Sequence, residues 1–144
     1  MRAILQRVSS ASVEMENACI ASIGQGFLLL LGIGKNDTAE EGRLLADKVA
    51  GLRVFADTDG KMNLSLLDSG GSVLVVPNFT LYANCRHGRR PEFLAAARPE
   101  TANPLFEKFL LQMKETGIKN VQKGCFGADM KVSLVNDGPV TLLL

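Results

Sequence analysis

The feature that most constrains the fold of this chain is an uninterrupted apolar segment near its start. Five apolar side chains, Phe27–Leu31, follow Gly26 and are closed by glycines at positions 32 and 34. The run is far shorter than the ~20 residues of a membrane span and does not alternate, so it predicts a buried strand over Gly26–Ile33. Hydrophobic residues make up 47% of the 144 residues, enough for one core. We therefore expect a single domain over residues 1–144 and no membrane partner.

Short apolar and β-branched segments predict much of the remaining chain as sheet. Further strands are expected at Ile4–Val8, Ser10–Met15, Ala18–Ile23, Arg53–Phe55, Ser72–Val76, Ile118–Gln122, Met130–Val135 and Val140–Leu144. Met130, Val132 and Leu134 share one face of their strand, with Lys131 and Ser133 on the other. The last strand is apolar to its end, so it needs cover from its own domain or from a second copy of the chain.

Two main helices and one short helix are expected. Thr38 and Glu41 have the spacing of a capping box, in which each side chain satisfies a free backbone N–H, so a helix should begin near Thr38. A second helix should begin at Asn103, a good N-cap, with Pro104 at its first helical position. The short helix is expected over Pro91–Ala97. Together with the strands, these helices predict an α+β domain that is rich in sheet.

Composition limits the partners and the chemistry of the chain. A net charge of +1 argues against nucleic-acid binding by the charge of the whole surface, so an RNA contact needs a local patch, and we expect no DNA partner. Cys19, Cys85 and Cys125 are widely spaced, and the single histidine, His87, completes no metal-binding pattern. We expect free thiols in a reducing cytoplasm, and neither a metal nor a cofactor.

The segment from Val76 to Tyr82 is the first candidate site. Pro77 cannot donate to a sheet ladder, so it marks the end of a strand. Asn78 and Thr80 then place polar side chains just beyond a buried strand, a common way to build a site on a rigid support. The alternative is an ordinary strand-to-loop transition in which Phe79 fills the core.

The second candidate is Asn136–Thr141, which contains Asp137, Gly138 and Pro139. These residue types are strong turn formers, and a turn between two strands is one interpretation. The other depends on the Gly138–Pro139 bond. Because X-Pro bonds are cis in only ~5–6% of folded cases, the sequence by itself favours trans. A cis bond would point two consecutive carbonyl groups the same way and form a polar backbone wall.

Taken together, the two segments resemble those of the D-aminoacyl-tRNA deacylase family. The family pairs a Ser-Gln-Phe-Thr-Leu segment with an Asn-x-Gly-Pro-Val-Thr segment. The second is matched throughout by Asn136–Thr141, and the first at Phe79–Leu81, with Pro77 and Asn78 in place of Ser-Gln. The similarity extends to other segments in the same order, namely Gln6–Val8, Gly60–Ser65 and Gly88–Pro91.

The resemblance implies a barrel-like fold and a homodimer with two equivalent sites at its interface. Gly138–Pro139 would be the family's cis dipeptide, inserted into the partner's pocket, where its carbonyl groups bind the amino group and exclude L side chains. Arg7 would support this dipeptide, as would Asn136 within the same motif. Phe79 would lie near the terminal adenosine. The remaining substrate-binding residues implied are Asn78, Phe126 and Met130.

The implied reaction is hydrolysis of the ester bond in D-aminoacyl-tRNA. The backbone N–H groups of Phe79 and Thr80 would stabilise the oxyanion. We predict that the Thr80 side chain positions or hydrogen-bonds, because no base is placed to activate its hydroxyl, and the nucleophile role is the alternative. The resemblance implies that the 2′-hydroxyl of the terminal adenosine helps to activate water. Achiral glycine could also enter a site that excludes only L side chains, so glycyl-tRNA is a possible substrate.

The densest positive charge in the chain is Arg86-His87-Gly88-Arg89-Arg90. It is either a solvated basic loop or, given a tRNA substrate, a phosphate-binding segment near the 3′ end formed by Arg86, Arg89 and Arg90.

Three other functions remain open. A related family that removes L-alanine from threonine tRNA has a proline at the position of Pro77, but alanine at that of Phe79. A dimeric RNA-binding module without catalysis, or a hydrolase of small esters that uses Thr80 or Cys125, would also fit the absence of an evident acid–base pair.

Overall fold

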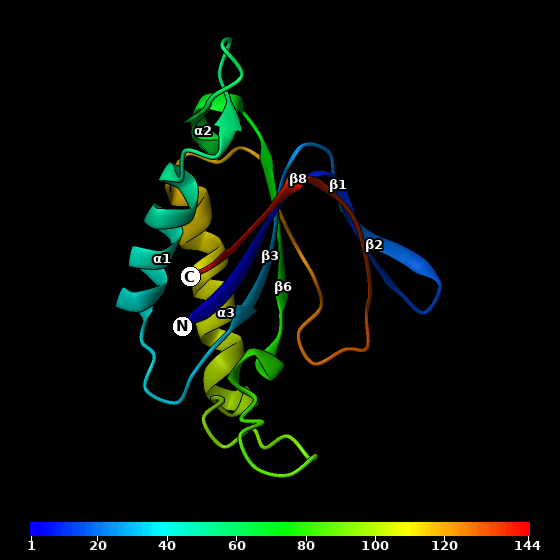
Figure 1. Cartoon of the computed structure of the whole chain (residues 1–144). Helices are drawn as coiled ribbons and strands as arrows, with labels where there is room; N and C mark the ends of the chain where they lie inside the picture. The colour runs from blue at the N-terminus through cyan, green and yellow to red at the C-terminus, as the bar shows by residue number, and fades with distance from the viewer.

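The computed structural model describes all residues from Met1 to Leu144 and consists of a curled sheet covered on one face by helices (Figure 1). The strands are β1 (Arg2–Met15), β2 (Ala18–Ile23), β3 (Gly26–Gly32), β4 (Phe55–Ala56), β5 (Met62–Leu64), β6 (Ser72–Pro77), β7 (Val121–Lys123) and β8 (Lys131–Leu143). The helices are α1 (Ala39–Gly51), α2 (Leu66–Ser69) and α3 (Pro99–Glu115), with a single 3₁₀ turn, η1 (Phe79–Tyr82). No helix has the length and hydrophobicity that a membrane crossing requires.

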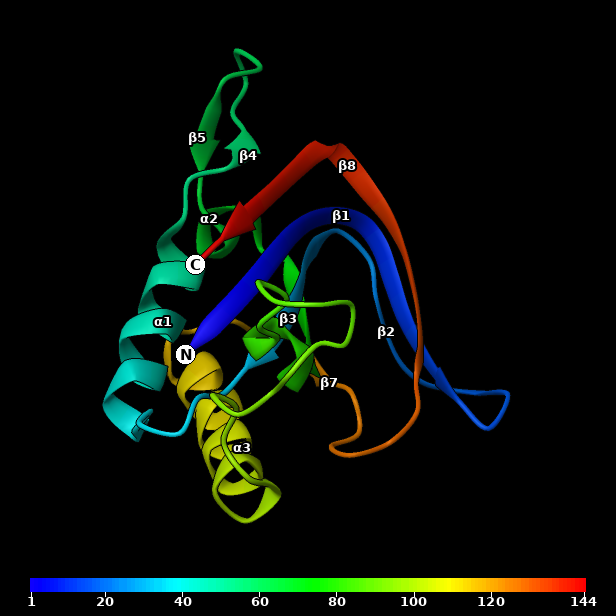
Figure 2. The ribbon, with the colours of Figure 1, turned by 60° about the horizontal axis from the view of Figure 1, so that its bottom comes forward.

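Strand β1 organises the main sheet, whose strand order is β2-β1-β3-β6-β7 with β8 paired to β1. Its first half, Arg2–Val8, is antiparallel to β3, and its second half, Ala11–Met15, is antiparallel to β2. Strand β8 follows β1 along both halves, while β6 is parallel to β3 and to β7. Because β1 and β8 bend together, the sheet curls into a nearly closed barrel (Figure 2). The predicted α+β, sheet-rich and barrel-like fold is confirmed.

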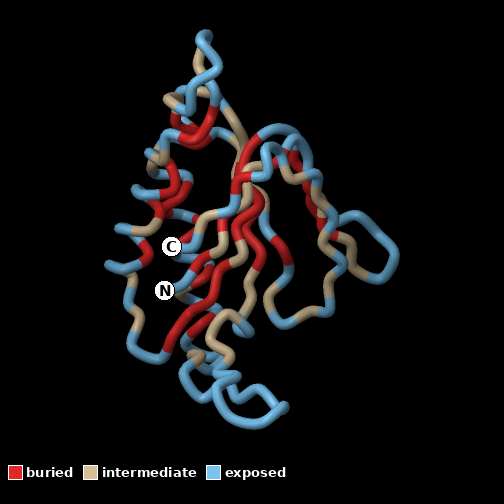
Figure 3. Tube along the Cα trace, viewed as in Figure 1, coloured by how far each residue is buried: buried red, intermediate tan, exposed pale blue.

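The buried strand predicted at Gly26–Ile33 is β3, and its two faces support two separate cores. Phe27 and Leu29 belong to the larger cluster, between the sheet and helices α1 and α3, whereas Leu28 belongs to a smaller cluster inside the curl of the sheet. The neighbouring strand β6 alternates in the same way, with Val73 in the first cluster and Leu74 in the second. Buried residues consequently follow one another along the central strands (Figure 3).

Helix α1 is capped as predicted. The Thr38 side chain accepts a hydrogen bond from the Glu40 N–H at 3.2 Å, and the Thr38 N–H donates to the Glu41 carboxylate at 2.8 Å. Hydrogen bonds from the Thr38 side chain and backbone lower the pKa of Glu41. The four-residue helix α2 was not predicted, although it has the same kind of cap, formed by Ser65 and Asp68.

The predictions around the second main helix were wrong at two places. Helix α3 begins at Pro99, one turn earlier than expected, and Pro104 lies inside it. Pro99 already supplies the favourable first-position proline, and the added turn buries Ala102 in the larger core. The segment Pro91–Ala97 is not a helix, because its backbone groups bond elsewhere: the Lys35 N–H donates to the Ala95 carbonyl at 3.2 Å.

Four strands also differ from their predicted extents by more than one residue, and the short strand β5 was not predicted. The two strands predicted at Ile4–Val8 and Ser10–Met15 form one strand, β1. The two strands predicted at Met130–Val135 and Val140–Leu144 form one strand, β8, that runs through the expected turn. Strand β4 is shifted to Phe55–Ala56, and β7 is shifted to Val121–Lys123.

The turn η1 is fixed to the rest of the fold through Tyr82. Its hydroxyl group donates to Asp37 at 3.1 Å, and the Arg2 guanidinium lies 4.5 Å from its ring centroid. Arg2 also donates to the Leu81 carbonyl at 3.0 Å. Burial and the neighbouring Asp37 carboxylate raise the pKa of Tyr82 to about 12.

Tyr82 is the only tyrosine of the chain, and there is no tryptophan, so its ionisation can be followed alone. We expect the phenolate absorbance of the folded protein to appear near pH 12 instead of the ordinary value of about 10. Because the folded pKa is the higher one, the associated stability is present below about pH 10 and is lost as the pH rises through 12. Asp37→Asn should move the transition towards pH 10; a wild-type transition near pH 10 without unfolding would contradict the contact.

Candidate functional site

The segment Asn136–Thr141 forms a bulge in the ladder between β1 and β8. Gln6 pairs with Thr141, and Val8 pairs with Asn136. One residue, Arg7, therefore lies between the two pairs on β1, against four residues, 137–140, on β8. The ladder cannot accommodate three extra residues in plane, so they leave it and bend the strand. Gly138 and Pro139 are exposed on this bulge.

The Gly138–Pro139 bond is cis, as the resemblance implied and against the expectation from the sequence by itself. Gly138 has a φ of +122°, a conformation that L side chains rarely adopt, and a Cβ atom at this position would lie 2.9 Å from a guanidinium nitrogen of Arg7. Both backbone conformation and space therefore require glycine at this position.

Arg7 supports the bulge from beneath. Its Nε donates to the Asp137 carbonyl at 3.2 Å and is also 3.2 Å from the Asp137 carboxylate. Its Nη1 donates to the Val54 carbonyl. Only 12% of the Arg7 side chain is exposed, whereas 51% of the Asp137 side chain is. The side chain thus connects the bulge to the segment that precedes β4.

Gln6 closes the base of the bulge, and the sequence analysis assigned it no role. Its Oε1 accepts hydrogen bonds from Asn136 Nδ2 at 2.6 Å and from Thr141 Oγ1 at 3.2 Å. Asn136 therefore contacts the base of the bulge through Gln6. One feature of the sequence could have indicated Gln6: it precedes Arg7 in Gln6–Val8, a segment that is similar to the family.

The second half of the candidate site is η1, which Asn78 caps. Asn78 Oδ1 accepts from the Thr80 N–H at 3.2 Å and from Thr80 Oγ1 at 2.5 Å. The Thr80 hydroxyl proton is therefore directed at an amide oxygen, which is not a base, and the geometry gives no support to a nucleophile. The Thr80 N–H is occupied as well, whereas the Phe79 N–H stands at the first position of the 3₁₀ turn, where a donor has no partner within the helix.

Phe79 separates two cavities. It is 57% exposed, so it does not fill the core, and its ring meets the edge of Phe93 at a centroid distance of 5.0 Å. On one side is an apolar cavity of about 420 Å³ that includes Phe126. On the other is a cavity of about 550 Å³ that includes Gln6 and Met130, and both cavities share Pro77, Asn78, Phe79 and Gly127. The predicted pocket residues Phe126 and Met130 therefore line two different cavities, and Phe79 belongs to the wall of both.

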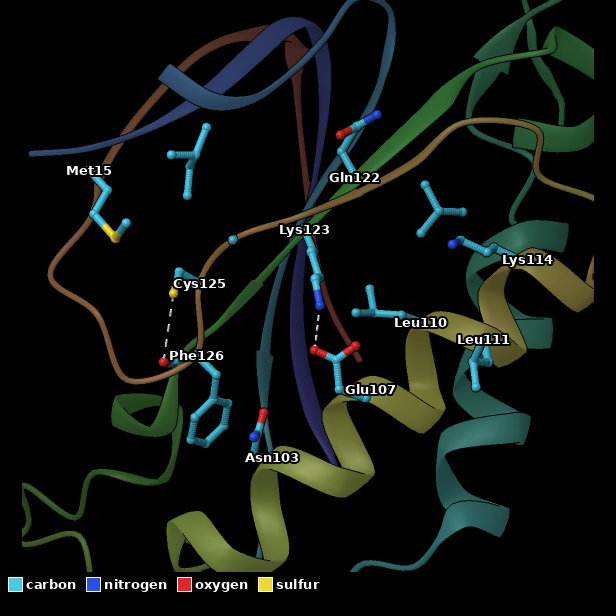
Figure 4. A pocket seen from close by; sticks show the side chains of 13 residues that line it. Met15, Asn103, Glu107, Leu110, Leu111, Lys114, Gln122, Lys123, Cys125 and Phe126 are labelled. Carbon is cyan, nitrogen blue, oxygen red and sulfur yellow. Dashed lines mark hydrogen bonds and ion pairs between the residues drawn. The ribbon is translucent and has the colours of Figure 1, made fainter. Parts of the chain in front are cut away.

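The largest cavity, about 660 Å³, lies elsewhere, between α3 and the segment 121–126 (Figure 4). An ion pair of 2.5 Å between Glu107 and Lys123 lies in it, and its wall includes Phe126 and Cys125, the alternative nucleophile, but no residue of η1 or of the bulge. Size is therefore a poor guide here, and the cavities on either side of Phe79 are the candidate site.

The predicted tRNA-binding arginines occupy an exposed loop that begins just after η1. Asn84 and Glu92 close this loop by two backbone hydrogen bonds, of 2.8 and 3.2 Å, and by a bond of 2.6 Å between their side chains. Arg86, Arg89 and Arg90 are exposed, and none of them takes part in an ion pair. Glu92, the nearest acid along the sequence, hydrogen-bonds to Asn84 and forms no ion pair with these arginines.

Within one chain the two halves of the site remain apart. Neither Gly138 nor Pro139 lines the cavities beside Phe79. In Figure 1 the bend of β8 lies in the upper half of the molecule, and η1 with its following loop lies at the bottom. Cys19, Cys85 and Cys125 are exposed free thiols, and no group of three His, Cys, Asp or Glu side chains could hold a metal ion.

Comparison with known proteins defines the class. The family model described as D-Tyr-tRNA(Tyr) deacylase matches residues 4–144. The chain belongs to this family, and the resemblance stated from the sequence is confirmed.

Individual relatives agree with this membership. A protein of Roseiflexus castenholzii named D-aminoacyl-tRNA deacylase is 57% identical over all 144 residues, which cover 91% of that protein. A protein of Thermotoga petrophila with the same name is 54% identical over the whole chain and 96% of its own length.

Two solved structures share the fold. One, named c-Myc DNA Unwinding Element Binding Protein, has a TM-score of 0.95 at 39% identity and is matched over 100% of this chain and 97% of its own. The other is described as a probable eukaryotic D-amino acid tRNA deacylase. It has a TM-score of 0.86 at 16% identity, covers 99% of this chain and 97% of its own, and supports the fold alone.

Removal of the Arg7 guanidinium should destabilise the fold far more than removal of an exposed arginine. Arg7→Met leaves the Val54 and Asp137 carbonyl groups without their donor, and we expect a loss of about 1–3 kcal/mol in the free energy of unfolding. Arg43, which pairs on the exposed face of α1, is the matched control, and Arg43→Met should cost less than about 1 kcal/mol. Equal losses in denaturant unfolding would show that Arg7 does not support the bulge.

Proposed function

We propose that this protein hydrolyses the ester bond of D-aminoacyl-tRNA and releases the D-amino acid and free tRNA. The observation that carries the proposal is the exposed bulge at Gly138 and Pro139, which Arg7 and Gln6 hold from beneath. Gly138 and Pro139 form the exposed top of this bulge, here called the ridge. Because the ridge is rigid and has no partner in its own chain, it is suited to fill a cavity in another molecule. The names of the relatives at 54–57% identity agree with this activity.

The cavity that receives the ridge belongs to a second copy of the chain. Neither residue of the dipeptide lines the cavities of its own subunit, so a two-fold dimer is the arrangement that unites the two halves. The ridge offers backbone carbonyl groups, which bind an amino group but leave no space for a side chain of L configuration. Selection thus acts through exclusion. Glycine has no side chain to exclude, so glycyl-tRNA is accepted as well.

Phe79 supplies the main oxyanion donor. The ester carbonyl lies beside η1, where the free Phe79 N–H can donate to the developing negative charge. The Thr80 N–H and hydroxyl both face Asn78 Oδ1, so the threonine holds the shape of η1 and does not attack. Water is activated by the 2′-hydroxyl of the terminal adenosine, a group that the substrate itself brings. Phe79, Phe126 and Met130 form the apolar walls around the substrate.

The loop that contains Arg86, Arg89 and Arg90 binds phosphate groups close to the 3′ end of the tRNA. Its three unpaired arginines follow η1 directly, so they lie on the side of the molecule from which the acceptor end must enter. The protein works in the cytoplasm, where aminoacyl-tRNA is found. DNA is not a partner, because a net charge of +1 does not support binding along a duplex.

A panel of charged tRNAs tests the activity and its selectivity. The purified protein should release D-amino acids and glycine from tRNA, and should leave the L-aminoacyl esters of the same tRNA intact. Release of L-alanine in preference to D-amino acids would instead favour the L-alanine-removing relative. Binding of tRNA without release of any amino acid would leave an RNA-binding module and would overturn the proposal.

The nucleophile alternatives are tested by Thr80→Val and, separately, Cys125→Ala. Thr80→Val keeps the size of the side chain and the N–H that Asn78 caps, and removes one hydrogen bond worth about 1 kcal/mol. We expect kcat to fall less than about tenfold in the first variant and to stay unchanged in the second. A fall of several orders of magnitude in either variant would identify that residue as the attacking group.

A further inference from the structure

We propose that Gln6 is a positioning residue for chiral selection, which holds the Gly138–Pro139 ridge at the height required to exclude L side chains. The inference rests on the proposed function and adds to it a residue that contacts neither half of the dipeptide. Gln6 lies in β1, opposite Thr141 and two residues before Val8, which pairs with Asn136. It therefore stands at the base of the bulge, where β8 leaves and rejoins the ladder.

The contacts of Gln6 fix both ends of the bulge at one atom. Gln6 Oε1 accepts from Asn136 Nδ2 at 2.6 Å and from Thr141 Oγ1 at 3.2 Å. A third contact of 3.4 Å joins Asn136 Nδ2 to Thr141 Oγ1 and completes the triangle. Two donors directed at one oxygen also fix the orientation of the Gln6 amide, so its nitrogen faces away from the bulge.

The opposite side of Gln6 faces the cavity of its own subunit. Gln6 lines the 550 Å³ cavity together with Asn78, Thr80 and Met130. Its Nε2 makes no hydrogen bond within the chain, so two N–H donors remain on that side. Gln6 is thus the one residue that both contacts the flanks of the ridge and lines a cavity of the site. In a two-fold dimer each Gln6 holds its own ridge and lines the cavity that receives the partner's ridge.

A small displacement of the ridge relative to the cavity that receives it should change selectivity more than the stability of the fold. Arg7 still supports the middle of the bulge when the Gln6 clamp is lost, so the bend persists. The four residues 137–140 are then no longer fixed at their ends, and the dipeptide can move relative to the cavity. A misplacement of about 1 Å is enough to change reaction rates by orders of magnitude in enzyme sites. We therefore expect loss of discrimination between D and L substrates, with the protein still folded.

Two substitutions at Gln6 separate this role from ordinary packing. Gln6→Glu keeps oxygen acceptors for Asn136 and Thr141, and Gln6→Met keeps the length but removes them. We expect the ratio of kcat/KM for D- and L-aminoacyl esters of one amino acid to stay within about threefold of wild type in Gln6→Glu, and to fall about tenfold or more in Gln6→Met. Gln122→Met is the matched control, because the Gln122 side chain also hydrogen-bonds a neighbouring side chain, its Nε2 donating to Asn120 Oδ1 at 2.9 Å, but lies outside the site.

Thr141→Val is a second variant that leaves Gln6 in place and removes one donor of the clamp. It should lower the ratio on its own, and its effect should be less than additive with Gln6→Met, because both changes break the same contact. If Gln6→Met fails to fold, Thr141→Val decides the question.

The outcomes separate the two proposals. A wild-type protein that releases no D-amino acid overturns the proposed function. A wild-type protein that discriminates, with a ratio unchanged in Gln6→Met and Thr141→Val, overturns the role of Gln6 alone. Rescue by glutamate, with every variant still folded and unfolding in one cooperative transition, is the result that supports it.

Discussion

The pairing of β1 with β8 is the constraint on which the rest of the structure depends. Over most of its length this ladder is regular, and it closes the curl of the sheet. At one place a single residue, Arg7, opposes four residues of β8. Directly beyond Asn136 the register shifts again, because Ser9 of β1 has no partner, and this offsets only one residue of the excess. The ridge that carries Gly138 and Pro139 follows from this mismatch, and the polar contacts of Gln6 and Arg7 serve to fix its shape.

The other half of the site depends on how β6 ends. Pro77 forms the last pair of the parallel ladder with β3, opposite Leu31. Because the ladder ends there, the N–H that proline lacks interrupts no later pair of the ladder. Asn78 then begins η1, and asparagine is among the best residues for capping a helical turn, which glutamine is not. The replacement of the family's Ser-Gln pair by Pro77-Asn78 is thus compatible with a well-formed turn. In the structure Pro77 ends the strand and Asn78 caps η1, and Phe79 and Thr80 still line the cavities of the candidate site.

The sequence predicted the fold class and the central strands because their patterns are local and strong. Phe27–Leu31 has no alternative to a buried strand, and the Thr38 cap has its own signature. The errors arose where long-range contacts decide. Pro104 is a good first residue of a helix, but Pro99 precedes it and burial of Ala102 favours the longer helix. Asn136–Thr141 has the composition of a turn, and only the partner strand β1 makes it a bulge.

The candidate site was predicted as far as the family motifs extend. Arg7, Asn136 and the Gly138–Pro139 pair meet in the structure, and Phe79, Phe126 and Met130 surround neighbouring cavities. Gln6 was missed because a glutamine in a strand has no pattern of its own, and its importance comes from residues 130 or more positions away. The placement of Phe126 and Met130 in two different cavities likewise depends on packing, which spacing along the chain does not encode.

The phosphate-binding role proposed for the three unpaired arginines of the loop after η1 has a consequence for the salt dependence of tRNA binding. Each phosphate contact with a cation displaces condensed counterions, and the affinity for a single strand falls with salt by a slope of roughly 0.7 per contact on logarithmic axes. Three contacts lower the logarithm of the affinity by only about 2 for each tenfold increase in salt, much less than in proteins that contact many phosphates of a DNA duplex. Affinity of this kind survives at physiological ionic strength. It leaves recognition to the shape of the acceptor end, and it lets a product whose amino acid has been removed dissociate without a large electrostatic barrier.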